Sequence, residues 1–245
     1  MLEYIILGVI QGIFEWLPIS SQGIVAIVSQ FSIKDFQPLE IALFLHLGTF
    51  FAVLIYFRKE WVEVLKLRDL ALFRFLLITT MISGIVGFSL YNLVKSMAMG
   101  NGLLVITGFG LLLTAYFHKI KKTSGINSNK LAVIAGFLQG LAVIPGLSRS
   151  GATIFALSLG KLNPGEILKI SYMMSAPAVL AMAGFLFFQN PALISEGWPA
   201  LIFSFLIGLL TLNFLLKTAA KIDFFKFALI FAFLCFLGAG LELLI

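Results

Sequence analysis

Two stretches of the chain place the same polar residues in apolar surroundings. One begins at Gly8 and ends at Gly23, and the other begins at Gly136 and ends at Gly151. Aligned without a gap, the coinciding pairs are Gly8/Gly136, Gln11/Gln139, Gly12/Gly140, Ser20/Ser148 and Gly23/Gly151. The chain therefore carries an internal duplication, and we expect its functional residues at the polar centre of the two copies.

Arg149 is the most informative single residue of the second copy. Burying a guanidinium in such apolar surroundings costs several kcal/mol of free energy unless the group is paired or hydrated. Arg149 is expected at the start of a half-helix, where backbone N–H groups and neighbouring hydroxyls complete an anion-binding site. The neighbours that form this site are Gly146, Ser148, Ser150 and Gly151. The first copy offers an opposing donor-rich turn, formed by Ser20, Ser21, Gln22 and Gly23. Two facing turns of this kind suit a diphosphate.

Glu15 stands between Phe14 and Trp16, so its carboxylate also lies in an apolar frame. Three interpretations are open: a ligand for a divalent cation, Mg²⁺ or Ca²⁺, a general acid or base, or the partner of Arg149 that holds the two segments together. Gln11 is a candidate contact for the ligand. The alternative is that its side chain hydrogen-bonds to backbone groups that the interrupted helix leaves exposed.

His46 lies inside an apolar stretch, with Thr49 one helical turn further on. It is a candidate general base for a serine hydroxyl, and the alternative is a hydrogen bond between helices. Glu40 and Glu166 begin equivalent apolar stretches, where a carboxylate stabilises a helix N-terminus. We interpret both glutamates as helix caps.

The composition identifies an integral membrane protein. The chain has 245 residues, of which 60% are hydrophobic and 11% charged, and its mean hydropathy is +1.08. The single Cys235 excludes a disulfide framework within the chain. The formal net charge of +6 at pH 7 follows the membrane topology described below. We therefore expect no nucleic-acid partner.

Six apolar stretches are long enough to span a bilayer, at about 39–57, 72–94, 103–117, 167–188, 198–216 and 224–244. Two further segments, 4–29 and 131–159, are interrupted by proline, glycine and serine. We interpret each as a re-entrant hairpin of two half-helices, because non-helical backbone at membrane depth must be buried in protein or line a wet cavity.

The charges support this topology. Of the 17 lysines and arginines, 14 fall in the segments 58–74, 119–130, 161–169 and 217–226. The positive-inside rule makes these segments cytoplasmic and both termini external. Each half, about 1–118 and 131–245, then has one hairpin and three spans, so the second half is inverted. The predicted fold is an all-α polytopic membrane protein, a single domain over 1–245 built as an inverted repeat.

The same residues carry a family resemblance. The stretch from Gln11 to Gly23 resembles the signature E-G-x-x-E-[FW]-L-P-[IV]-S-S-x-G-H of the undecaprenyl-diphosphate phosphatases, the bacitracin-resistance family. The stretch from Pro145 to Thr153 matches that family's second signature, P-G-x-S-R-S-G-x-T. The likeness covers nearly the whole chain, and His46 to Thr49 also resembles a stretch common in the family.

The resemblance implies dephosphorylation of a polyprenyl diphosphate on the outer face of the cell membrane, usually with a divalent cation. It also implies two re-entrant hairpins within an interdigitated inverted repeat. By position, Glu15 takes the metal or acid/base role, and Ser21 is the nucleophile or phosphate ligand, with Ser20 beside it. Arg149 becomes the phosphate clamp, flanked by Ser148 and Ser150.

Two positions depart from the family signature. Gln11 replaces a glutamate, and Ile24 replaces the signature histidine. Neither residue can do proton chemistry. Two hypotheses follow: a phosphatase with another base, such as His46, or a non-catalytic polyprenyl-phosphate carrier or flippase that uses the same anion site. A homodimer is open in either case.

Overall fold

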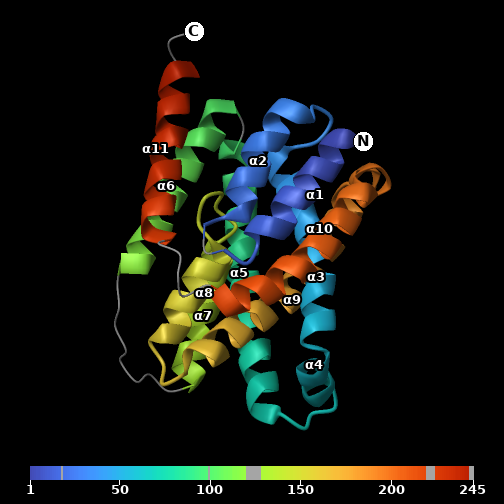
Figure 1. Cartoon of the computed structure of the whole chain (residues 1–245), viewed down its shortest axis with the longest axis vertical. Coiled ribbons are helices and arrows are strands. Elements are labelled where there is room, and N and C mark those ends of the chain that lie inside the picture. The colour runs from blue at the N-terminus through green and yellow to red at the C-terminus, as the bar shows by residue number, and fades with distance from the viewer. Residues whose placement is uncertain (18, 99, 120–127, 219–223, 243–245) are drawn as a thin grey trace.

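A computed structural model describes the chain except for residues 18, 99, 120–127, 219–223 and 243–245. The described residues form eleven α-helices and no strand (Figure 1). The helices are α1 Leu2–Phe14, α2 Ser21–Ser32, α3 Pro38–Tyr56, α4 Arg58–Leu65, α5 Leu70–Met97, α6 Gly100–Lys119, α7 Ser128–Leu141, α8 Arg149–Ser158, α9 Pro164–Gln189, α10 Pro191–Thr218 and α11 Phe224–Glu242.

Four helices are long and apolar enough to cross a bilayer: Pro38–Tyr56, Leu70–Met97, Pro164–Gln189 and Pro191–Phe214. This finding confirms the predicted all-α polytopic membrane protein. The other two predicted spans correspond to α6 and α11, whose described apolar parts, Asn101–Phe117 and Leu229–Gly240, are shorter. Part of the predicted loop 119–130 and the end of the last span lie outside the described residues.

Each interrupted segment forms two helices joined by a turn. A serine caps the second helix in both cases: Ser20 Oγ accepts from the Gly23 N–H, and Ser148 Oγ accepts from the Gly151 N–H. Such caps satisfy backbone donors that the first turn of a helix leaves free. In Figure 1 the hairpins α1–α2 and α7–α8 enter from opposite ends of the molecule, and their turns lie near its middle.

The two halves pack through each other. The α1 helix packs along α10, α7 packs along α5, and α3 packs against both α9 and α10. A Cβ at Gly8 would collide with the carbonyl oxygen of Ala200, and one at Gly136 would lie 2.8 Å from the carbonyl oxygen of Thr79. These duplicated glycines let each hairpin approach a helix of the other half.

Glu40 lies in the first turn of α3, as predicted, although its side chain accepts no hydrogen bond from the backbone there. Its carboxylate accepts a hydrogen bond from Lys95 Nζ at 2.6 Å and one from Asn190 Nδ2 at 3.1 Å. It therefore ties the start of α3 to the ends of α5 and α9. Glu166 does cap its helix, because it forms a reciprocal capping box with Asn163.

The sequence does not predict the short helix α4, because its eight residues fall in the charged segment 58–74, which is predicted to be cytoplasmic. Its sequence has too few apolar residues to stand out as a span. In Figure 1 it lies at the opposite end of the molecule from the N-terminus.

We expect Gly8→Leu and Gly136→Leu to destabilise the protein strongly. Overpacking a well-packed contact costs about 1–3 kcal/mol, and here the obstacle is rigid backbone. Thermal unfolding in detergent measures the effect. Gly184→Leu is the matched control, because a Cβ there meets nothing within 4 Å. Equal melting temperatures for Gly8→Leu and Gly184→Leu would contradict the close α1–α10 contact.

Candidate active site at the two hairpin turns

Glu15 lies at the centre of the site, directly after α1, and its side chain is only 3% exposed. Its Oε2 atom accepts hydrogen bonds from Gln11 Nε2 and from Ser21 Oγ, both at 2.7 Å. His46 Nε2 lies 3.2 Å from the same oxygen, and Arg149 Nη2 donates to Oε1. The four predicted catalytic residues therefore meet at one buried carboxylate.

Arg149 is the first residue of α8 and reaches Glu15 from the other hairpin. Its Nη1 also donates to the carbonyl of Ser171 on α9 at 3.3 Å. The pairing that the sequence left open as an alternative is thus present. A buried ion pair contributes little to stability on balance, since desolvation offsets its attraction. The pairing therefore does not by itself explain why these charges are there.

Hydrogen bonds also join the two turns directly. They run from the Gly146 N–H to Ser20 Oγ (3.1 Å), from Ser150 Oγ to the Leu17 carbonyl (3.0 Å) and from Gln22 Nε2 to the Val143 carbonyl (3.0 Å). Of the predicted substrate-binding residues, Ser20, Ser150 and Gln22 consequently lie where the hairpins touch, and Ser148 contacts Ser150 beside them.

The predicted glycines have other contacts. The N–H groups of Gly23 and Gly146 donate to Ser20 Oγ, and that of Gly151 donates to Ser148 Oγ. Gly146 has a φ of +88°, and a Cβ there would collide with the Thr107 carbonyl, so only glycine fits. Phosphate contact by these three glycines stays a prediction. Because Ser20 Oγ accepts both of its bonds, its own hydroxyl hydrogen remains for a ligand.

His46 contacts the carboxylate rather than a serine. Its Nδ1 lies 2.7 Å from the Ala42 carbonyl, and its Nε2 faces Glu15. The Ser21 hydroxyl donates to Glu15 as well, so the group in contact with that serine is the carboxylate. The imidazole therefore lies between the Ala42 carbonyl and the Glu15 carboxylate.

Two residues that the sequence reading missed support the turns. Thr114 on α6 donates to the Gly146 carbonyl at 3.1 Å and accepts from the Ser148 N–H at 2.9 Å. Tyr172 on α9 donates to the Trp16 carbonyl at 3.1 Å. The sequence could have pointed to these residues only as hydroxyls in apolar stretches. Thr107 is also a hydroxyl in an apolar stretch, but its Oγ1 makes no hydrogen bond, so this pattern alone does not identify a residue that supports the turns.

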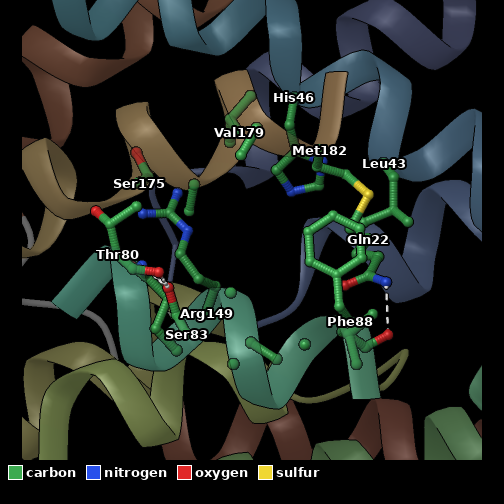
Figure 2. A pocket seen from close by; sticks show the side chains of 18 residues that line it. Gln22, Leu43, His46, Thr80, Ser83, Phe88, Arg149, Ser175, Val179 and Met182 are labelled. Carbon is green, nitrogen blue, oxygen red and sulfur yellow. Dashed lines mark hydrogen bonds between the residues drawn. The ribbon is translucent and has the colours of Figure 1, made fainter. Parts of the chain in front are cut away.

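Two cavities adjoin the site. The smaller, about 10 Å³, lies between the turns and is lined by Glu15, Ser21, His46, Ser148 and Arg149 among others. The larger, about 120 Å³, shares Gln22, His46 and Arg149 with it and continues past apolar side chains (Figure 2), including Leu43, Phe88, Val179 and Met182. The site thus combines a polar end with an apolar chamber.

A divalent cation fits part of this donor set. Among the described residues no three His, Cys, Asp or Glu side chains gather as a metal cluster. However, Gln11 Oε1 is buried beside Glu15 without a hydrogen-bond partner. Protein-bound Mg²⁺ often takes one or two carboxylates and completes its shell with substrate phosphates. Glu15 and Gln11 are the residues that would hold such a cation.

Comparison with known proteins decides the family. Residues 4–237 match the family described as bacitracin resistance protein BacA. The chain belongs to the BacA family. The resemblance seen in the two signatures is therefore confirmed, and with it a multi-pass membrane protein.

Several relatives in this family carry the name undecaprenyl-diphosphatase. The protein of Methanococcoides burtonii is 34% identical over 249 residues, covering 93% of this chain and 94% of the relative. The protein of Sulfurisphaera tokodaii is 34% identical over 243 residues, covering 90% of each. The protein of Methanopyrus kandleri is 31% identical over 262 residues, covering 98% and 94%.

We expect Thr114→Val to lower the free energy of unfolding by about 1–3 kcal/mol, because it leaves the Gly146 carbonyl and the Ser148 N–H buried without a partner. Thr114→Ser should retain most of the stability. Thr107→Val is the matched control on the same helix, where the lost hydroxyl makes no hydrogen bond, so it should be neutral or stabilising. Equal loss in both valine variants, measured by detergent or thermal denaturation, would exclude a specific role for Thr114.

Proposed function

We propose that this chain hydrolyses a polyprenyl diphosphate, such as undecaprenyl diphosphate, to the lipid monophosphate and phosphate, and so recycles a carrier lipid. The observation that carries the proposal is the convergence of Glu15, Ser21, His46 and Arg149 at one buried point. An apolar chamber beside that point suits the lipid chain. The names of the relatives agree with this activity.

In the proposed mechanism, Arg149 clamps the diphosphate through its planar guanidinium, and the Ser20 hydroxyl adds a donor beside it. The hydroxyls of Ser148 and Ser150 add donors only when they give up their present bonds to each other and to a backbone carbonyl. These groups stabilise charge that develops on the phosphoryl oxygens. A phosphate at Arg149 competes with the Glu15 carboxylate that occupies the guanidinium in the structure. Substrate binding therefore exchanges one anion for another.

The released carboxylate then acts on Ser21. Glu15 lies 2.7 Å from Ser21 Oγ and takes its proton while that oxygen attacks the terminal phosphorus. The bond to the bridging oxygen breaks, and the lipid monophosphate leaves with the electron pair and takes the proton from Glu15. Water then attacks the phosphoserine and gives a proton to the freed Glu15 carboxylate, which returns it to Ser21 Oγ as phosphate leaves. His46, whose Nε2 lies 3.2 Å from Glu15 Oε2, holds this carboxylate in place and exchanges the transferred proton with it.

A divalent cation, Mg²⁺ or Ca²⁺, is a second part of the proposal. Glu15 and the unpartnered Gln11 Oε1 would hold it together with phosphate oxygens. When bound, such a cation neutralises phosphate charge.

The proposed topology places both termini and the opening of the site on the outer side of the cell membrane, with the two halves as an inverted repeat. The positive-inside rule supports it, because the segment 58–74 with its five basic residues is then cytoplasmic. In Figure 1, α4 of that segment lies at one end, and the N-terminus and the last turn of α11 lie at the other. A homodimer stays a prediction.

The direct test is phosphate release from undecaprenyl diphosphate by the purified protein in detergent. We expect turnover that EDTA lowers and that Mg²⁺ or Ca²⁺ restores. Arg149→Ala, purified in the same way, controls for a contaminating phosphatase. No release by the wild-type protein at any pH, with lipid phosphate still bound, would contradict hydrolysis and favour a carrier or flippase.

We expect Arg149→Lys to lose most activity although it keeps the positive charge. Lysine is a point charge without the planar fork that binds a phosphate through two parallel hydrogen bonds. The measurement is kcat/KM beside the melting temperature of the variant. A variant that is folded and fully active would show that the fork is unnecessary.

We expect His46→Ala to lower turnover about 10²–10⁴-fold, the usual size of an acid–base contribution, because the catalytic Glu15 carboxylate loses the imidazole that exchanges its proton. His118→Ala, at the chain's other histidine, is the comparison variant. If His46 served only as a hydrogen bond between helices, its loss would cost about 1 kcal/mol of stability and leave turnover unchanged.

A further inference from the structure

Helix packing does not explain why positions 84 and 87 of α5 are glycine. A Cβ at Gly84 would meet nothing within 4 Å, and one at Gly87 would meet only the Gly140 carbonyl oxygen, at 3.7 Å. By contrast, a Cβ at Gly12 or Gly140 would lie within 3.0 Å of atoms of a neighbouring helix. Glycine inside a helix lowers its stability relative to alanine, so residues 84 and 87 call for another reason.

Both glycines line the large cavity that adjoins the site. On the facing helix α9 the cavity is lined by other small or flexible residues, Ala178, Ala181 and Met182. Next to these positions, Ile85 is 65% exposed and Leu180 is 56% exposed, so each helix also has a side that faces the bilayer. The cavity therefore lies beside the lipid-facing surface, between α5 and α9.

The hydroxyls in the cavity wall do not make it polar. Thr80 Oγ1 donates to the Leu76 carbonyl at 2.6 Å, and Ser175 Oγ donates to the Tyr172 carbonyl at 2.6 Å. Hydroxyls that bond back to their own helix offer few donors to a ligand. Besides hydroxyls, the polar side chains in the lining are Gln22, His46, Gln139 and Arg149. Figure 2 shows Gln22, His46 and Arg149 at the cavity wall.

We propose that Gly84 and Gly87 keep open a side entrance between α5 and α9, through which the isoprenyl units next to the phosphate enter the site from the bilayer. This inference rests on the proposed function, since it needs a lipid phosphate at Arg149. The missing side chains leave room for the methyl branches of a prenyl chain. A larger residue at position 84 therefore narrows the entrance without disturbing a packed contact.

The test is binding of radiolabelled undecaprenyl phosphate to the purified protein in detergent. We expect Gly84→Leu to raise the dissociation constant about 10-fold or more, the discrimination that a few methyl groups produce in an apolar pocket, and Gly84→Ala to raise it less. Inorganic diphosphate should displace the label from wild type and from Gly84→Leu with the same inhibition constant, because the phosphate clamp is unchanged.

Gly184→Leu on α9 is the control, since a Cβ there also meets nothing within 4 Å and the residue is outside the cavity lining. Its binding should equal that of wild type. Unchanged binding by Gly84→Leu, or an equal loss in Gly184→Leu, would overturn the entrance and leave the proposed function intact. A wild-type protein that binds no lipid phosphate would instead overturn both.

Discussion

The interaction on which the structure depends is the buried pairing of Glu15 with Arg149. Each charge belongs to a different hairpin, and each side chain is largely buried. Removing one partner of such a pair typically costs about 3–5 kcal/mol, because the other charge stays buried without compensation. The turns must therefore meet, and the contacts α1–α10 and α7–α5 bring them together. A ligand anion is a natural replacement for the carboxylate, which is why the pair belongs to a binding site.

The duplication supplies a repeated scaffold with different chemistry in each copy. Gly8 and Gly136 do the same work, since each lets its hairpin approach a helix of the other half. At the starts of the second half-helices the copies differ, with Ser21 opening α2 and Arg149 opening α8. Equivalent backbone positions thus present a hydroxyl from one side and a guanidinium from the other. The asymmetry creates a site that neither copy could form alone.

Much of this arrangement could be predicted from the sequence. Hydropathy and interrupted segments predicted the helices and the hairpin turns, and polar residues in apolar surroundings predicted Glu15, Ser21 and Arg149. Local reasoning placed Glu40 in the first turn of its helix but did not show its ion pair with Lys95, because that partner is remote in sequence. Thr114 was missed for the same reason. The serine caps that occupy the glycine N–H groups also depend on turn geometry, which spacing alone does not define.

The exchange of Glu15 for a phosphate group at Arg149 is measured most directly with Glu15→Gln and a methylene-bridged, non-hydrolysable undecaprenyl diphosphate. Binding is determined in EDTA, so that a cation held by the carboxylate does not contribute. If the carboxylate competes for Arg149, its removal leaves the affinity equal to or higher than that of the wild type while hydrolysis of the natural substrate is lost. Clearly weaker binding by a folded Glu15→Gln protein would contradict the exchange.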